Sequence, residues 1–173
     1  MAQKYKCDGC SKRVDCQPTP MTSIILENLP LWVTYLLGGF IFYLLWWPLA
    51  IIYLEICLLS LTLHIALICP YCYHYGTNTC PSGYGVVATR FFTPKKGRNF
   101  ATVFKRFIWV VLPGWVLPPI GAGYLLVQDR TNVLVWALLI AFSIVGFAIL
   151  QIVSKQYGCK KCKNKKNCPW GPK

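Results

Sequence analysis

The chain has 173 residues, of which 55% are hydrophobic and 15% aromatic, while only 13% are charged. Soluble domains carry roughly 25% charged residues, so this composition is typical of a membrane protein. The formal net charge is +13, but the basic residues flank long apolar runs, so we expect no nucleic-acid partner. Five acidic residues in all argue against a carboxylate-based hydrolase and against a hard-cation channel lined by Asp and Glu.

Residues 1–22 form a polar segment that carries Cys7-Asp8-Gly9-Cys10 followed by Cys16. This segment is much longer than the polar start of a secretory signal, and the first apolar run begins near Ile24. We therefore expect no cleavable signal peptide. The segment is interpreted as a retained cysteine motif.

Residues 23–69 predict two transmembrane helices. The apolar run from Leu29 to Cys69 would be about 60 Å long as a single helix, and a bilayer core is about 30 Å thick. Pro48 follows Trp46-Trp47; proline breaks helices, and paired tryptophans favour a membrane interface. We therefore predict spans at Leu31–Trp47 and Leu49–Ile68.

Three groups of the second predicted span, Glu55, Cys57 and His64, are ionisable, and such groups inside a membrane are functional candidates. Cys57, Ser60 and His64 share one helix face, which could provide a proton or quinone path. Alternatively, His64 makes an interhelical hydrogen bond and Cys57 packs as a small residue. Glu55 lies on another side, near the outer end. The chain has only two histidines, and His74 lies in a loop, so no bis-histidine haem is expected.

Residues 70–106 predict a loop with a second cysteine motif, Cys69-Pro70-Tyr71-Cys72 followed by Cys80. An unstructured loop of this length is uncommon between packed elements, so we expect a compact cap held by a metal, with His74 as a possible extra ligand. At its end the apolar residues recur with helical spacing beside basic residues, which predicts a short interfacial amphipathic helix. These apolar residues are Phe100, Val103, Phe104 and Phe107.

Residues 107–154 predict two further spans, from about Phe107 to Val127 and from Val133 to about Ser154. The third span contains Pro113-Gly114, Pro118-Pro119 and two more glycines, so we expect a kinked or locally unwound helix. Such a helix is tolerated where neighbouring helices satisfy the freed carbonyls. It could line a ligand cavity, and close packing is an equally good explanation of the small residues.

Residues 155–173 carry Cys159-Lys160-Lys161-Cys162 followed by Cys168, which repeats the C-x2-C-x5-C spacing of the N-terminal motif. Every Lys and Arg except Arg130 falls before the first span, between the second and third, or after the fourth. The positive-inside rule then predicts an integral membrane protein with both termini and the central loop in the cytoplasm. These positive charges are also expected to bind anionic lipid headgroups.

Cytoplasmic thiols stay reduced, so metal binding is the leading interpretation of the three cysteine triplets. Structural zinc sites usually combine two cysteine pairs, whereas each group here has a pair plus one further cysteine, an arrangement common for iron-sulfur clusters. We prefer iron-sulfur, with zinc as the alternative. The predicted ligands are Cys7, Cys10, Cys16, Cys69, Cys72, Cys80, Cys159, Cys162 and Cys168, with His74, His64 and Cys57 as possible extra ligands or relays.

Two short resemblances accompany this interpretation. Residues 157–169, which hold the C-terminal triplet, resemble the three-cysteine end of the iron-sulfur staple of RecB-like nucleases and part of the auxiliary-cluster motif of some radical enzymes. That resemblance implies cluster ligation. Cys69-Pro70-Tyr71-Cys72 is the same tetrapeptide as the glutaredoxin active site, and four helices with paired cysteines resemble the membrane oxidoreductases that generate disulfides and pass the electrons to quinone. In such an enzyme Cys69 is the nucleophile and Cys72 resolves.

The sequence therefore predicts an all-α integral membrane protein with four transmembrane helices and a cysteine-rich cytoplasmic cap. Its predicted function is electron transfer through iron-sulfur clusters, as a small or accessory subunit that meets other membrane redox subunits or quinone. A zinc-stapled scaffold or metal-handling protein is the first alternative. A thiol-disulfide oxidoreductase is the second.

Overall fold

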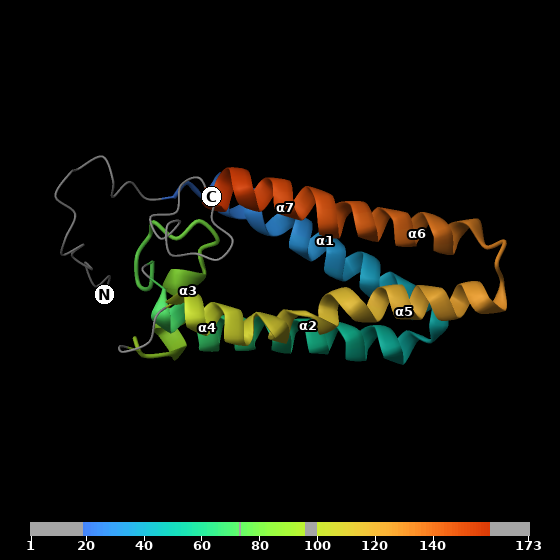
Figure 1. Ribbon diagram of the computed structural model, residues 1–173, viewed down its shortest axis with the longest axis horizontal. Coiled ribbons are helices and arrows are strands. Elements are labelled where there is room, and N and C mark those ends of the chain that lie inside the picture. The colour runs from blue at the N-terminus through green and yellow to red at the C-terminus, as the bar shows by residue number, and fades with distance from the viewer. Residues whose placement is uncertain (1–18, 73, 96–99, 160–173) are drawn as a thin grey trace.

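The computed structural model describes residues 19–72, 74–95 and 100–159, and this part of the chain is helical and contains no strand (Figure 1). Four of its helical runs are long and apolar enough to cross a membrane: Met21–Leu45, Trp47–Tyr71, Phe100–Gln128 and Val133–Tyr157. They lie side by side along the long axis of the molecule (Figure 1). The prediction of four apolar helices of spanning length is confirmed.

The first two helices, α1 (Met21–Leu45) and α2 (Trp47–Ile68), are separated by one extended residue, Trp46, with φ −170° and ψ 127°. Pro48 stands in the first turn of α2, where its missing N–H interrupts no helical hydrogen bond. The predicted break is confirmed. However, α1 begins at Met21 rather than at the predicted Leu31, because polar residues in its first turns hydrogen-bond to the loop after α2.

The third run consists of α4 (Phe100–Phe107), a 3₁₀ turn at Ile108–Val111, and α5 (Pro113–Gln128). The helix predicted from the spacing of Phe100 to Phe107 is present, and α4 packs along α2 in line with α5 (Figure 1). The described run therefore begins before the predicted start at Phe107. That α4 lies in a membrane interface stays a prediction.

The 3₁₀ turn before Pro113 is the local unwinding that the prolines of this span predict. Pro118 inside α5 cannot donate to the carbonyl of Gly114, four residues earlier. The Tyr53 hydroxyl of α2 donates to that carbonyl instead, over 2.9 Å. The interior therefore satisfies a backbone group that the proline leaves without a partner.

The same region is closely packed. Tyr35, Tyr53 and Cys57 form a buried cluster between α1 and α2. A Cβ on Gly38 of α1 would lie 2.7 Å from Tyr53 Cζ and 2.8 Å from Pro118 Cγ. A second buried cluster, formed by residues of α1, α5 and α6, contains Ile41, Ala122, Leu126 and Val135. Glycine at position 38 therefore lets α1, α2 and α5 approach one another.

The fourth run begins, as predicted, at Val133 and consists of α6 (Val133–Ser143), a π-helical stretch at Ile144–Ile149, α7 (Leu150–Val153) and a further π-helical stretch at Ser154–Cys159. Asn132 caps α6, because its side chain accepts a hydrogen bond from the Val135 N–H over 3.3 Å. The apolar run extends to Tyr157, slightly past the predicted end at Ser154.

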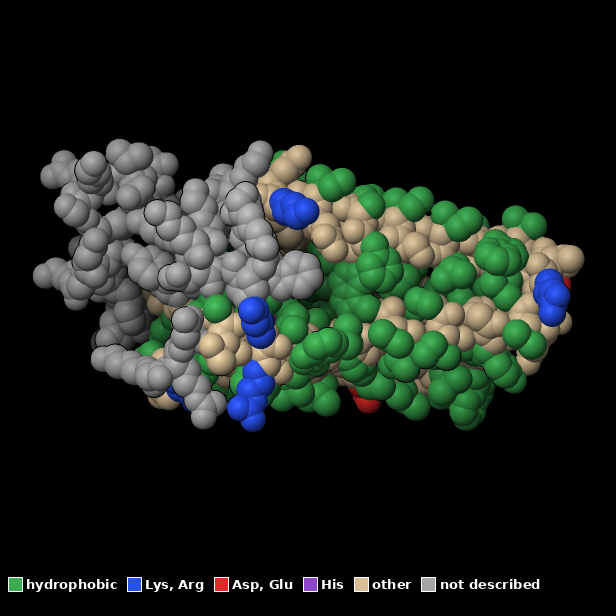
Figure 2. Space-filling model, viewed as in Figure 1, with side chains coloured by type: hydrophobic (Ala, Val, Ile, Leu, Met, Phe, Trp, Pro, Cys, Tyr) green, Lys and Arg blue, Asp and Glu red, His purple; other side chains and the backbone are tan. Residues whose placement is uncertain are grey.

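The start of α1, the end of the fourth run and the loop after α2 lie at one end of the bundle, and the short loop after α5 lies at the other (Figure 1). Lys and Arg side chains are visible at both ends of the bundle, and the flank between them is largely hydrophobic (Figure 2). We call the first end the cysteine end, because the central triplet lies there. Whether the cysteine end faces the cytoplasm stays a prediction from the distribution of lysine and arginine.

Candidate functional site

The central triplet is positioned by the end of α2. Cys69 is the C-cap of α2, and its N–H donates to the Ile65 carbonyl, while a 3₁₀ turn at Cys69–Tyr71 carries the chain to Cys72. The Cys72 N–H returns to the Cys69 carbonyl over 3.0 Å. Cys69 is only 9% exposed and Cys72 is half-buried. The Cys-x-x-Cys pair therefore follows one of the four apolar helices of spanning length and lies at the carbonyl end of its dipole.

Cys80 faces the same region from the loop that follows. Gly83 turns the chain with φ +77°, a conformation that favours glycine, and α3 (Tyr84–Phe91) begins immediately after it. The Gly85 N–H at the start of α3 donates to Cys80 Sγ over 3.3 Å. Burial raises the pKa of the Cys80 thiol, and hydrogen bonds from nearby backbone N–H groups oppose that rise only in part. Without a cation the neutral thiol is therefore favoured here.

His74 holds the loop in shape. It is 3% exposed, and its Nδ1 shares a 3.0 Å hydrogen bond with the Thr79 hydroxyl. The Thr77 hydroxyl donates to the His74 carbonyl over 3.0 Å. A Cβ on Gly85 would collide with that same carbonyl oxygen and approach Cys80 Cβ to 3.1 Å. One ring nitrogen of His74, predicted as an extra metal ligand, is thus engaged in fixing the turn beside Cys80.

A polar network that the sequence did not predict joins this loop to α1. The Ser82 hydroxyl donates to Glu27 Oε1 over 3.1 Å, and Asn28 Nδ2 donates to the Ser82 carbonyl over 3.1 Å. The Tyr84 hydroxyl donates to Asn28 Oδ1. Burial, followed by the nearby Glu27 carboxylate and thiols, raises the pKa of Tyr84 to about 12. The only sequence signal was two polar residues, Glu27-Asn28, in an otherwise apolar stretch.

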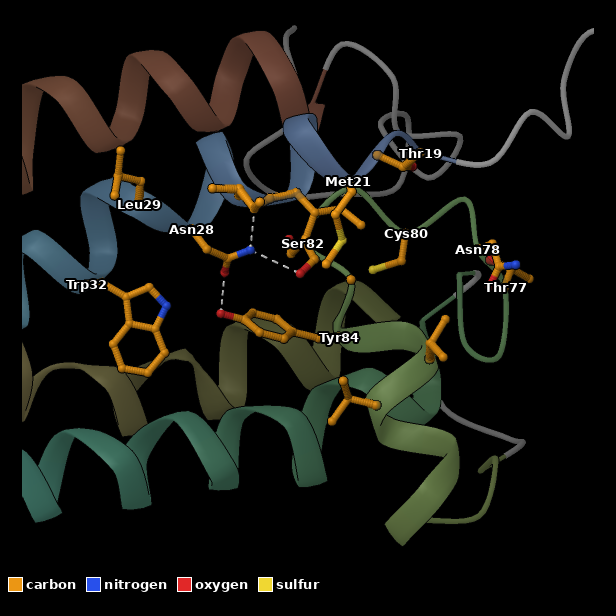
Figure 3. Close-up of a pocket in the computed structure, with 15 residues that line it drawn as sticks. Thr19, Met21, Asn28, Leu29, Trp32, Thr77, Asn78, Cys80, Ser82 and Tyr84 are labelled. Atoms are coloured by element: carbon orange, nitrogen blue, oxygen red, sulfur yellow. Dashed lines mark hydrogen bonds between the residues drawn. The ribbon is translucent and has the colours of Figure 1, made fainter. Parts of the chain in front are cut away.

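A cavity of about 650 Å³ lies between the first turns of α1 and the loop with α3. Figure 3 shows Tyr84 pointing toward Asn28, with Trp32 on one side and Cys80 on the other side of the cavity. Most of the lining is apolar, and Asn28, Ser82 and Tyr84 on its wall hydrogen-bond to one another.

The three thiols of the central triplet are near one another, since Cys72 and Cys80 lie within electrostatic range of Cys69. Within residues 19–72, 74–95 and 100–159, however, no three His, Cys, Asp or Glu side chains group closely enough to hold a metal ion. The described triplet alone is therefore not a complete metal site. Cys7, Cys10, Cys16, Cys162, Cys168 and the side chain of Cys159 lie outside the described part of the chain, and their metal ligation stays a prediction.

The predicted intramembrane face of α2 points into the bundle at Cys57 and Ser60, which are 1% and 5% exposed. Cys57 packs beside Tyr35, Tyr53 and Gly114, and among the described residues it belongs to no group that could hold a metal ion. His64 Nδ1 is buried and has no hydrogen-bond partner among the described residues. The structure thus gives Cys57 a packing role, and the interhelical hydrogen bond predicted for His64 is absent at Nδ1 in the described part. The structure brings neither residue to the triplet at Cys69.

Comparison with known proteins gives no relative: no protein-family model, curated protein or solved structure matches the chain.

Proposed function

We propose that this integral membrane protein carries cysteine-ligated iron-sulfur centres at its cysteine end and transfers electrons at the membrane surface. One observation carries the proposal: the fold brings the chain next to all three cysteine triplets to the same end of the bundle (Figure 1). The start of α1 follows the N-terminal triplet, α2 ends at the central triplet, and the fourth run ends at Cys159. The described residues that flank the three motifs, which are far apart in the chain, therefore lie at one end of the bundle.

Chain reach supports ligation between triplets. The Thr19 N–H donates to the Asn78 carbonyl over 2.8 Å, so the chain leaving the N-terminal triplet is tied to the loop that holds Cys80. Cys16 precedes Thr19 by three residues, which span at most about 11 Å. The fourth run contacts α1 at this same end. In the proposed protein, thiols of the terminal triplets complete the ligand set that the central triplet begins.

The environment of Cys80 suits a metal-bound sulfur. A backbone N–H points at Sγ, and hydrogen bonds to sulfur are one of the means by which proteins set cluster potentials. The raised pKa of Cys80 means that the thiolate needs a cation to form, and a metal ion supplies one. Described basic residues at the cysteine end, among them Arg90 and Lys95, offset the negative charge of a thiolate-ligated centre.

A thiol-disulfide oxidoreductase is less well supported by this geometry. A nucleophilic Cys69 would need a stabilised thiolate and access to a partner protein. Cys69 instead stands at the carbonyl end of α2 and is 9% exposed. We therefore assign Cys69 and Cys72 to ligation, with the cysteine end in the cytoplasm, the loop and α3 as its cap, and α4 at the membrane interface.

Metal analysis tests the proposal. Protein purified without oxygen is expected to contain iron and acid-labile sulfide, with broad absorbance near about 400 nm. Replacing Cys69, Cys72 and Cys80 together by serine should remove part of the iron, and Cys57→Ser, a matched change at a packing position, should leave it unchanged. A colourless protein with stoichiometric zinc would exclude electron transfer and leave a zinc-stapled scaffold.

Topology is tested separately in intact cells. A membrane-impermeant thiol reagent should fail to label Cys7 and Cys159 in intact cells, and it should label them once the membrane is opened and the metal is removed. Labelling of either residue from outside would place the triplets in an oxidising compartment, where a disulfide framework replaces metal ligation.

A further inference from the structure

The cavity between α1 and α3 has one wall on the outward side of the bundle. Four exposed side chains of α1 form this wall at helical spacing: Met21, Ile25, Leu29 and Trp32. They belong to an apolar helix of spanning length, so their outward side faces the hydrocarbon of a bilayer. A lipophilic molecule dissolved in the bilayer therefore has a direct route into the cavity.

The lining of the cavity is uncharged. Among the described residues that line it, none is Lys, Arg, His, Asp or Glu. An anionic phospholipid headgroup is recognised by Lys and Arg, so this lining does not suit one. The volume of about 650 Å³ lies within the range of about 300–1,000 Å³ that is typical of small-molecule sites. The occupant that matches the lining is small, neutral and lipophilic.

Two polar groups on the wall match the two redox forms of one class of molecule. The Trp32 indole N–H makes no hydrogen bond within the described chain, and Figure 3 shows its nitrogen on the side of the ring that faces Tyr84. The Tyr84 hydroxyl gives its hydrogen to Asn28 Oδ1, and its oxygen can still accept one. Trp32 therefore offers a donor for a quinone carbonyl, and Tyr84 offers an acceptor for the hydroxyl of the reduced quinol.

Cys80 lies on the wall across the cavity from Trp32 (Figure 3). We infer that the cavity binds a membrane quinone, which accepts electrons from the iron-sulfur centre that Cys80 helps to ligate. The inference rests on the proposed function for its electron source. The quinone takes up two electrons, one in each of two steps, and two protons from water at the cysteine end. Both carbonyl oxygens become hydroxyls, and the centre is oxidised by one electron in each step.

Photolabelling of the full chain in lipid nanodiscs tests the site. An azido-benzoquinone with a short alkyl tail is expected to label the α1 and α3 residues of the cavity, and excess decylubiquinone should compete. Trp32→Phe should raise the concentration for half-maximal labelling about threefold to tenfold, because one hydrogen bond is lost. Trp109→Phe, at a 67% exposed position outside the cavity, is the matched control and should not change it. Label spread evenly over the four apolar helices would overturn the inference.

Electron transfer is tested on protein that has been reduced with dithionite and freed of the excess. Decylubiquinone and ferricyanide, a water-soluble oxidant, are compared by the rate at which each restores the visible absorbance of the centre. Val87→Trp fills the cavity and should lower the ratio of the quinone rate to the ferricyanide rate at least tenfold, whereas Ile140→Trp, on α6, should leave the ratio unchanged. A detergent-unfolding curve matched to the native chain verifies that each variant is folded.

The two proposals fail in different ways. A centre that ferricyanide reoxidises and decylubiquinone does not would overturn the quinone inference and leave the proposed function standing. Competed labelling of the cavity in a protein that holds only zinc would refute the proposed function, and with it electron transfer to the quinone, while the cavity would stand as a quinone-binding site.

Discussion

Replacing Tyr53 by phenylalanine removes the hydroxyl that donates to the Gly114 carbonyl over 2.9 Å and keeps the ring. The ring still stacks on Phe42 at 5.1 Å between centroids, so the loss is confined to the hydrogen bond. Interhelical hydrogen bonds in membranes contribute about 0.6 kcal/mol on average and up to about 1.7 kcal/mol. Because Pro118 leaves this carbonyl without a helical partner, we expect a value near the upper limit, about 1–2 kcal/mol.

The assay is reversible unfolding by SDS titration of the protein in mixed micelles. Tyr43→Phe is the matched control, since Tyr43 of α1 is 57% exposed, and it should leave the unfolding free energy unchanged. Pro118→Ala restores an N–H that can bond to the Gly114 carbonyl, so Tyr53→Phe should cost much less in that background. Equal effects of Tyr53→Phe in both backgrounds would refute the claim that the hydroxyl substitutes for the missing proline N–H.

Further predictions concern the packing of the bundle and the cap. Gly38→Ala should destabilise the bundle by about 1–3 kcal/mol in the same titration, because its Cβ would lie 2.7 Å from Tyr53 Cζ, whereas Gly123→Ala, with nothing within 4 Å, should be neutral or stabilising. Gly85→Ala should open the cap and speed alkylation of Cys80 at least several-fold, while Val86→Ala, at a 44% exposed position, should not. In metal-free protein, alkylation of Cys80 should become fast only above the ordinary cysteine pKa of about 8.5, because burial raises the pKa of Cys80. The unfolded thiol ionises first, so the cap should also lose stability as pH rises past that value; an alkylation midpoint at or below it would contradict the burial of Cys80.

Hydrophobicity and helix breakers were enough to predict the four spans, because span length and apolar composition are local properties of the sequence. The break at Trp46 and the unwinding before Pro113 followed from the missing proline N–H in the same way. The start of α1 was not predicted, because Glu27 and Asn28 interrupt the apolar run, and both make hydrogen bonds to a loop that is distant in sequence. The predicted span therefore began after these two polar residues, whereas α1 extends through them to Met21.

The sequence was enough to predict which cysteines belong to the candidate site, but not which hydrogen bonds surround them. Spacing singled out Cys69, Cys72 and Cys80 as a group, and the structure places Cys72 and Cys80 within electrostatic range of Cys69. Spacing did not show that His74 would bond to Thr79, or that Gly85 would direct its N–H at Cys80. These contacts depend on the turn at Gly83, where φ is +77°. A cysteine pattern therefore indicates a class of ligand, while the backbone around it decides the chemical state of each thiol.

Reduction of the anaerobically purified protein tests the central claim most directly. If the cysteine end carries electrons, dithionite should bleach the visible absorbance and produce an electron paramagnetic resonance signal of a reduced iron-sulfur cluster, and reoxidation should restore the original spectrum. A metal content and spectrum that dithionite leaves unchanged would contradict electron transfer, because a centre that accepts no electron can only hold the cysteine end together.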